Sequence, residues 1–329
     1  MTRATTSTAN TRNPVDGRRL RVVIRQTGPF DLRLSLEAAA SFFPAAAPPP
    51  ITLRAPLQVD GVTTIVEVSQ SSKAAGTLQV SSTSPLAGIR LRGVARWLTS
   101  AELDLRPFYA SVATHPVMAD VVRTLHGLKP LRPATLLEMA VIAITEQQLS
   151  LAAAFHIRSR LIRRFGKPLG DLWVFPSPER LAAASLDELG KCGLSLRKAE
   201  YIKGLGKRIA NSGLDFATLQ EKTDERIRDA ILSYRGFGEW SVQYILGRGF
   251  GRSDSLPSAD TGLRRVVGHY FGKGHRLTAE ELEDALAAFK PFRGLAAFYL
   301  AVHWRLRRRA KPMPTNHAET TKNILTTPR

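Results

Sequence analysis

The chain has 329 residues, of which 43% are hydrophobic, and a net charge of +19 at pH 7. This length allows two or three domains with their own cores, and no apolar run approaches the roughly 20 residues of a membrane span. The single cysteine, Cys192, excludes disulfides within the chain, cysteine-based zinc sites and a cysteine-ligated iron–sulfur cluster. We expect Cys192 to be a packed small residue and not a nucleophile.

Positive charge extends beyond the two ends of the chain. Residues 1–21 carry +4 and residues 305–329 carry +6, which leaves +9 for residues 22–304. A basic body favours a polyanionic partner, with nucleic acid first and an anionic membrane second, and general basic solubility is the alternative. The N-terminus lacks the apolar segment of a secretory signal, so we expect a cytoplasmic, nucleoid or nuclear protein that is not secreted. Its Arg- and Thr-rich, acid-poor start leaves a transit peptide open.

The N-terminal third predicts a small α+β domain over residues 18–100, with an antiparallel sheet. Residues 1–17 have few large apolar side chains and are expected to be a disordered basic tail. Asp60-Gly61 is a typical hairpin turn between two strands, and Pro44 ends a short helix. The expected strands lie within 18–35 and at 51–59, 62–69 and 77–81, and the short helix lies at 36–43.

From about residue 101 the apolar residues recur at helical spacing, which predicts an all-helical domain over residues 101–310 and a flexible tail over 311–329. The fold class is therefore mostly α with an N-terminal α+β domain. Ser185 and Thr278 each begin a predicted capping box. The basic run from Arg305 ends a helix, where cations suit the dipole, and contact with DNA is an equal alternative. Helices are expected at 106–113, 117–127, 135–146, 150–165, 178–184, 186–192, 196–212, 216–219, 224–233, 239–247, 258–271, 279–288 and 293–308.

Residues 226–249 predict two helices joined by a short glycine hairpin. Gly236, Phe237 and Gly238 form the turn, and the glycines bring bare backbone to the surface. Ser241 and its neighbours then begin a helix whose free N–H groups would hold a phosphate. A plain surface turn between helices is the alternative, and the glycine motif alone favours it because such short motifs recur by chance.

Several short motifs occur in a characteristic order along the chain: Asp-Leu-Arg-Pro-Phe-Tyr at 104–109, Ile-Thr-Glu-Gln-Gln-Leu-Ser at 144–150, Gly-Phe-Gly-Glu-Trp-Ser-Val-Gln-Tyr at 236–244, Leu-Pro-Ser-Ala-Asp-Thr-Gly-Leu-Arg-Arg at 256–265 and Pro-Phe-Arg at 291–293. Together they resemble the helix-hairpin-helix (HhH-GPD) DNA glycosylase superfamily, and most closely its DNA-3-methyladenine glycosylase II (AlkA-type) branch. The resemblance covers roughly residues 20–310, including the small sheet domain. It implies a monomeric enzyme that flips a damaged base out of double-stranded DNA and cuts its N-glycosidic bond. Alkylated purines are the expected substrates, with deaminated purines as a further candidate.

Within the segment 256–266, Asp260 is the candidate catalytic carboxylate. Cleavage of a glycosidic bond builds positive charge on the sugar, and a fixed carboxylate stabilises that charge or activates a water molecule. Pro257 and Ser258 mark a helix start, and a helix N-terminus attracts negative charge. We therefore expect a base or an electrostatic stabiliser and not a general acid. A purely structural role in the first helical turn is the alternative.

Trp240 stands where relatives with lyase activity carry a lysine whose amine attacks the sugar. Because Trp240 supplies no amine, we predict a monofunctional enzyme that leaves an abasic site in an intact strand. Trp240, Tyr244 and Phe292 match positions that line the base pocket, where aromatic rings suit flat, cationic bases; plain core packing is the alternative for each. Phe292 departs from the best-known pattern, which has Trp there, and this weakens any prediction of substrate range.

Gln148 matches the residue that enters the duplex where the target nucleotide leaves the stack. The alternative is that Gln147 and Gln148 cap the helices that they join. No membrane partner and no cofactor are expected, except that the hairpin carbonyls could hold a monovalent cation. Two other functions stay open: a non-catalytic HhH protein that binds DNA or DNA damage, and an oxidised-base or mismatch glycosylase of the same superfamily.

Overall fold

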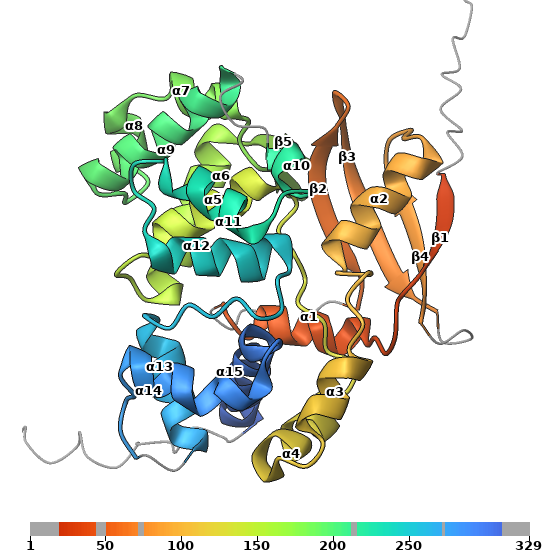
Figure 1. Cartoon of the computed structure of the whole chain (residues 1–329). Helices are drawn as coiled ribbons and strands as arrows, with labels where there is room; N and C mark the ends of the chain where they lie inside the picture. Colours follow the sequence, from red (N-terminus) through yellow and green to blue (C-terminus); the bar gives the residue numbers. More distant parts are fainter. Residues whose placement is uncertain (1–19, 44–50, 72–75, 212–215, 272–273, 311–329) are drawn as a thin grey trace, which may run out of the picture.

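The fold consists of a sheet unit beside two groups of helices (Figure 1). The sheet unit comes first in the chain, and a short helix connects it to the helical part. The expected tails at 1–17 and 311–329 lie outside the described residues, as does Pro44. The computed structural model describes residues 20–43, 51–71, 76–211, 216–271 and 274–310.

The N-terminal unit is a four-stranded antiparallel sheet in the order β1-β4-β3-β2. The predicted turn is confirmed: Val59 pairs with Val62, and the two residues between them, Asp60 and Gly61, have φ values of 48° and 79°. Two positive φ values suit a tight hairpin turn, which favours Asp-Gly. The strands are β1 (Arg21–Arg25), β2 (Leu53–Val59), β3 (Val62–Gln70) and β4 (Thr77–Ser82).

The alternating stretch 30–34 was expected to be a strand, and this prediction is wrong. It begins helix α1 (Leu32–Ala40), because the side chain of Asp31 accepts a backbone N–H from the first turn at 2.8 Å and so caps the helix. Leu32 and Leu36 lie one helical turn apart, and both are buried in the core of the sheet unit. Tertiary packing of this apolar face outweighs the local alternation of apolar and polar residues.

Helix α2 (Gly88–Leu98) lies over one face of the sheet and was not predicted from the sequence. Leu91, Ala95 and Leu98 are buried against the strands and repeat at helical spacing. A search for this spacing could have found the helix. The sheet and α2 together enclose the first hydrophobic core.

The helices of residues 106–310 form two groups with separate cores, and the mostly α fold class is confirmed. The expected helices are present with ends within three residues of the prediction, and both capping boxes, at Ser185 and Thr278, are formed. One group contains α3 (Arg106–Val112), α4 (Pro116–Thr124), α13 (Thr261–Tyr270), α14 (Ala279–Leu286), the 3₁₀ turn η2 (Ala287–Phe289) and α15 (Arg293–Ala310). The other contains α5 (Leu136–Glu146), α6 (Leu151–Phe165), α7 (Pro178–Ala183), α8 (Leu186–Gly190), α9 (Leu196–Ala210), α10 (Phe216–Leu219), α11 (Asp224–Leu232), α12 (Glu239–Ile245) and the π-helical turn η1 (Leu246–Phe250).

Two short strands interrupt the region that was expected to be all helical. Strands β5 (Lys167–Leu169) and β6 (Leu172–Val174) form a hairpin whose turn contains Gly170 at a φ of +62°. Asp171 in this turn accepts two hydrogen bonds from Arg54 on β2, at 2.7 and 2.9 Å. The hairpin therefore joins the helical part to the edge of the sheet.

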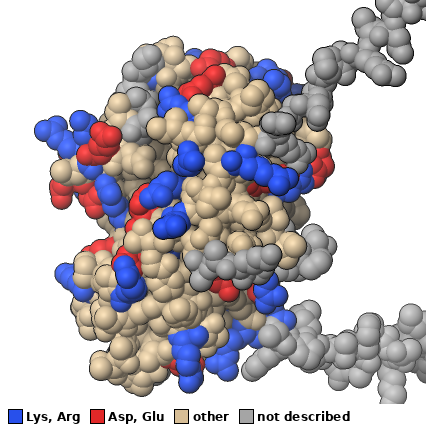
Figure 2. Space-filling model, turned by 90° about the vertical axis from the view of Figure 1, so that its right-hand side faces the viewer, with Lys and Arg blue, Asp and Glu red and all other residues tan. Residues whose placement is uncertain are grey.

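The surface charge on one face is mixed (Figure 2), with Lys and Arg interspersed with Asp and Glu. Exposed ion pairs such as that of Arg90 with Asp60, at 2.9 Å, neutralise part of this charge. Each such pair contributes little to stability.

Among the described helices, no single helix is both long enough and apolar enough to span a membrane. The segments 279–289 and 293–309 reach that length and composition only when taken together, and they are bent by 105° relative to each other.

A buried lysine joins the sheet unit to the helices. Lys129 is 0% exposed, and its ammonium donates to Gln26 Oε1 at 3.0 Å and to the carbonyl of Thr27 at 2.8 Å. Burial lowers the pKa of Lys129 to about 8 from a usual value of 10.5. The charged form is therefore less favourable in the folded protein than in the unfolded chain.

We expect Lys129 to make stability rise with pH. Between about pH 8 and 10.5 the unfolded chain binds a proton that the folded protein lacks, so the free energy of unfolding increases with pH across this window. The increase approaches about 3 kcal/mol at its upper end, since one pKa unit corresponds to about 1.4 kcal/mol. Urea unfolding of the wild type and Lys129→Met at pH 7 and pH 10 measures this gain. A difference between the two proteins that does not change with pH would contradict it.

Candidate active site

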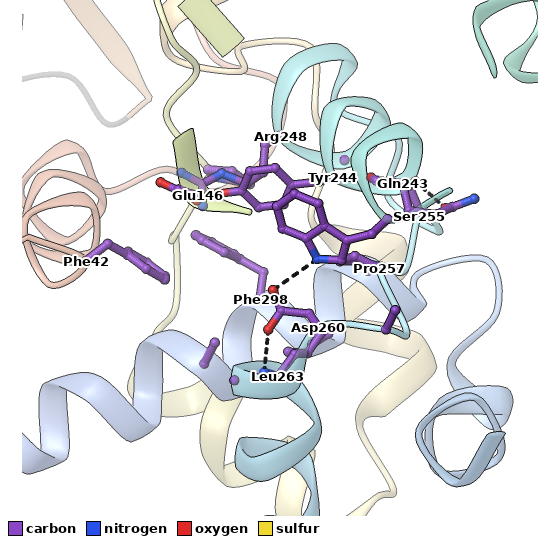
Figure 3. A pocket seen from close by; sticks show the side chains of 18 of the residues that line it. Phe42, Glu146, Gln243, Tyr244, Arg248, Ser255, Pro257, Asp260, Leu263 and Phe298 are labelled. Carbon is purple, nitrogen blue, oxygen red and sulfur yellow. Dashed lines mark hydrogen bonds between the residues drawn. The ribbon is translucent and has the colours of Figure 1, made fainter. Parts of the chain in front are cut away.

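A cavity of about 950 Å³ lies between the two groups of helices. Residues from α5, α12, α13 and α15 line it, and Phe42 reaches it from the segment after α1. Figure 3 shows these side chains converging on one space from elements that are far apart in the sequence. A large concave space with a few polar groups and several rings is the usual form of a ligand site.

Asp260 lies on the wall of this cavity and begins helix α13. Its Oδ1 accepts the backbone N–H of Leu263 at 2.8 Å, which caps the helix, and its Oδ2 accepts Nε1–H of Trp240 at 3.3 Å (Figure 3). The sequence offered a structural role in the first helical turn as the alternative, and the structure instead places Asp260 at the N-cap, one residue before α13. This cap also fixes the carboxylate at the cavity wall, with one oxygen serving the helix and the other facing Trp240.

Trp240 and Tyr244 form an aromatic stack along the same wall. Their ring centroids are 4.9 Å apart and the planes are inclined by 14°. The spacing of four residues on α12 places the two side chains on one face of the helix. The structure therefore brings Trp240, Tyr244 and Asp260 to one site, as the sequence predicted.

Glu146, which the sequence analysis did not single out, lies at the far end of this stack. Tyr244 Oη donates to Glu146 Oε2 at 2.7 Å, and Arg158 forms a buried ion pair with Glu146 Oε1 at 3.0 Å. Burial and the neighbouring carboxylate raise the pKa of Tyr244 well above its usual range, so its hydroxyl remains a donor. The sequence held no signal for this contact, which joins residues 98 positions apart.

Arginines cover part of the aromatic surface in the cavity. Arg305 lies over the ring of Phe42 at 4.6 Å, and Arg248 lies between the rings of Phe42 and Tyr244, at 5.4 and 5.8 Å. Burial lowers the pKa of Arg305, while the nearby Asp260 partly opposes that shift. The cavity is therefore lined by both signs of charge and is not a purely aromatic cage.

Phe292 does not line the cavity, and its predicted place in the base pocket is wrong. Its ring packs 5.9 Å from that of Phe108, against the core of the α15 group. Phe298, further along the chain on α15, lines the cavity instead (Figure 3). The chain turns sharply between η2 and α15, and this turn, which the sequence did not reveal, directs Phe292 inward.

The two glycines of the hairpin have different roles. Gly236 has a φ of +105°, and a Cβ on it would lie 2.4 Å from the ring of Tyr201, so no other residue fits without strain. Gly238 has a φ of −124°, caps α12, lines the cavity mouth and has open space around the position of a Cβ. Phe237 between them is half-buried and packs on Tyr234. The tight turn thus depends on Gly236.

Ser241 was expected to contribute to phosphate binding through the free N–H groups at the start of the helix, and the structure shows that its side chain faces the protein interior. The residue is only 1% exposed, and its Oγ lies 3.2 Å from Nε2 of Gln147. The same Nε2 donates to the carbonyl of Gly236 at 2.8 Å. The Gly236 carbonyl thus accepts one N–H from Gln147, and the monovalent cation expected at the hairpin carbonyls stays a prediction. Among the described residues, no three His, Cys, Asp or Glu side chains lie close enough to share a metal ion.

Gln148 lies exposed at the rim of the cavity in a left-handed conformation with a φ of +54°. Contacts of the residues that precede Gln148 hold this corner. Lys198 donates to the carbonyls of Thr145 and Gln147 at 3.0 and 2.6 Å, and the side chain of Gln147 binds the hairpin. The following residue, Leu149, is 42% exposed at the same rim.

The segment 141–291 matches the model of the HhH-GPD superfamily base excision DNA repair proteins. This segment contains the hairpin, Trp240 and Asp260, which the structure brings to one cavity. This segment of the chain belongs to the HhH-GPD superfamily. Within it, the predicted likeness to the AlkA-type branch is confirmed by curated relatives named DNA-3-methyladenine glycosylase.

Three similar proteins show the extent of the likeness. The chain is 31% identical over 162 residues to the putative DNA-3-methyladenine glycosylase YfjP of Bacillus subtilis, which covers 49% of this chain and 55% of that protein. It is 26% identical over 207 residues to the DNA-3-methyladenine glycosylase of the same organism, covering 62% and 67%. The chain thus spans about half to two thirds of the length of these relatives. The 3-methyladenine DNA-glycosylase from Archaeoglobus fulgidus shares the fold, with a TM-score of 0.74 and 21% identity over 87% of this chain and 98% of that one.

The different environments of the two glycines give a matched pair of variants. Gly236→Ala forces a Cβ into Tyr201 at a positive φ, and we expect it to reduce stability by on the order of 2 kcal/mol and to weaken binding to DNA. Gly238→Ala has room for the methyl group and should change stability by less than about 0.5 kcal/mol. Thermal unfolding of the two variants measures the difference. Equal losses in both would contradict the assigned role of Gly236.

Proposed function

We propose that the protein is a DNA-3-methyladenine glycosylase that acts on double-stranded DNA and hydrolyses the N-glycosidic bond of alkylated purines. The observation that carries this proposal is the carboxylate of Asp260, fixed beside Trp240 on the wall of a cavity of about 950 Å³, directly after the hairpin of an HhH-GPD chain. The names of the curated relatives and the order of the motifs support it.

In the proposed reaction the damaged nucleotide leaves the duplex and its base enters the cavity. The glycosidic bond then lies near Asp260, whose negative charge stabilises the positive charge that develops on the sugar. A water molecule completes the hydrolysis and leaves an abasic site. The capped position of Asp260 supports this role because the carboxylate needs no rearrangement before the reaction.

The lining of the cavity supports a monofunctional reaction. Schiff-base chemistry requires an amine, and of the described residues that line the cavity none is a lysine. Trp240 occupies the position at which a lyase would carry that amine. The DNA strand should therefore remain intact after base release.

DNA would approach the side of the cavity that carries the hairpin and Gln148. Backbone N–H groups at the start of α12 would meet a phosphate, and Gln148 would fill the gap that the flipped nucleotide leaves. Deaminated purines are a second candidate substrate, and because they carry a 6-oxo group in place of a 6-amino group, we expect them to be released more slowly than 3-methyladenine. The same fold occurs in a Clostridium acetobutylicum 8-oxoguanine glycosylase/lyase in complex with DNA, with a TM-score of 0.68 and 15% identity, so an 8-oxoguanine duplex belongs in any substrate panel.

Asp260→Asn separates catalysis from the helix cap. Asn caps a helix about as well as Asp, so we expect stability to change by less than about 1 kcal/mol. Loss of the charge should lower base release by about 100-fold or more. Release of methylated purines from alkylated duplex DNA, measured by chromatography beside the wild type, tests this. Lesion binding by the wild type without release of any base would instead favour a non-catalytic damage-binding protein.

Borohydride trapping tests the monofunctional reaction. Incubation of the wild type with a lesion duplex should release the base, yield alkali-labile abasic sites and give no covalent protein–DNA product, because no amine reaches the sugar. A known bifunctional glycosylase serves as the positive control. A trapped adduct, or strand breaks before alkali treatment, would contradict the prediction.

Gln148→Ala should lower base release from a paired duplex by on the order of tenfold, because the gap left by the flipped nucleotide is no longer filled. Release from single-stranded DNA, which has no stack to fill, should change little. Both rates are measured with the same lesion. If Gln148→Ala keeps its duplex activity and Leu149→Ala loses it, the neighbouring leucine has the role assigned to Gln148.

A further inference from the structure

A second carboxylate lies in the cavity, and the proposed reaction gives it no role. Of the described residues that line the cavity, only Asp260 and Glu146 are acidic. The side chain of Glu146 is 8% exposed and lies at the C-terminal end of α5 (Figure 3). A buried carboxylate is costly unless its oxygens have hydrogen-bond partners.

The position of this carboxylate is fixed by two donors. Tyr244 donates to Oε2 at 2.7 Å and Arg158 to Oε1 at 3.0 Å, and Arg158 also donates to Thr145 Oγ1 at 3.2 Å. An ionised carboxylate can accept about four hydrogen bonds. Among the described residues each oxygen of Glu146 meets one donor, which sets its orientation and leaves it able to accept a further N–H group.

Glu146 and Asp260 lie at opposite ends of one aromatic wall. A chain of contacts runs from Glu146 to Tyr244 at 2.7 Å, from Tyr244 to Trp240 at 4.9 Å between ring centroids, and from Trp240 to Asp260 at 3.3 Å. A purine whose glycosidic bond lies at Asp260 has its sugar end there. Its opposite edge, which carries the group at C6, then points toward Glu146.

We propose that Glu146 is a specificity-determining residue that accepts a hydrogen bond from the exocyclic 6-amino group of the flipped base. This inference rests on the proposed function. A 6-amino group supplies an N–H to the carboxylate, whereas a 6-oxo group places a second acceptor against it with no proton between them. Pairing of this kind discriminates strongly in a buried site, because the wrong partner leaves polar groups unsatisfied. The protein therefore prefers 3-methyladenine to 7-methylguanine by more than the difference in how readily their glycosidic bonds break.

The test compares the two bases in one sample. Duplex DNA treated with a methylating agent contains both lesions, and the released 3-methyladenine and 7-methylguanine are measured together. Glu146→Gln keeps the size of the side chain and an acceptor oxygen but adds an amide donor, which suits a 6-oxo group. We expect the ratio of kcat/KM for 3-methyladenine to that for 7-methylguanine to fall by about tenfold or more. Parallel loss of both rates with an unchanged ratio would overturn the proposal, because a purely structural Glu146 predicts that result.

Glu138→Gln is the matched control. Glu138 lies on the same helix, accepts the backbone N–H of Ala134 at 3.0 Å and does not line the cavity, so its variant should keep the wild-type ratio.

Inhibition of the wild type by free bases gives a second measurement if Glu146→Gln does not fold. Free 3-methyladenine should inhibit base release by the wild type at least about tenfold more strongly than free 7-methylguanine, and equal inhibition would overturn the proposal. Failure of the wild type to release any base would contradict the proposed function itself, not the role of Glu146 alone.

Discussion

The helix cap at Asp260 is the interaction around which the cavity is arranged. One oxygen satisfies a backbone N–H at the start of α13, and the other faces Trp240. Displacing the carboxylate would leave a helix end without its partner, so the fold itself keeps this group in place. The structural and the chemical interpretation of Asp260 are compatible, because each uses a different oxygen of one side chain.

The rim of the cavity depends on contacts between segments that are distant in the chain. Gln147 binds the hairpin carbonyl of Gly236, and Lys198 on α9 binds the carbonyl of Gln147. The hairpin and the corner that carries Gln148 therefore form one unit. In the proposed function this unit would hold the hairpin, which contacts a phosphate, at a fixed distance from Gln148, which fills the gap in the duplex.

Charge of both signs lines the cavity, and the described lining residues include more arginines than carboxylates. Asp260 and Glu146 face an aromatic stack, while Arg248 and Arg305 lie over Phe42. Such a lining can place hydrogen-bond donors and acceptors separately against a base, which an aromatic cage alone cannot do. Selection by hydrogen bonding then adds to the affinity that stacking supplies.

The sequence by itself determined what depends on neighbours in the chain: the helix starts, the Asp60-Gly61 turn, the hairpin and the position of Asp260 at a helix N-terminus. These features arise from capping and turn residues that act within a few positions. It did not separate Gly236 from Gly238, because only the ring of Tyr201 makes one of them obligatory.

Tertiary structure alone decided which side chains meet. Phe292 packs against the core and Phe298 lines the cavity because of the turn before α15, and Glu146 reaches Tyr244 across 98 residues. The stretch 30–34 leads into helix α1 because Leu32 and Leu36 pack in the core of the sheet unit. Each outcome depends on packing between distant segments, and local sequence patterns do not record such packing.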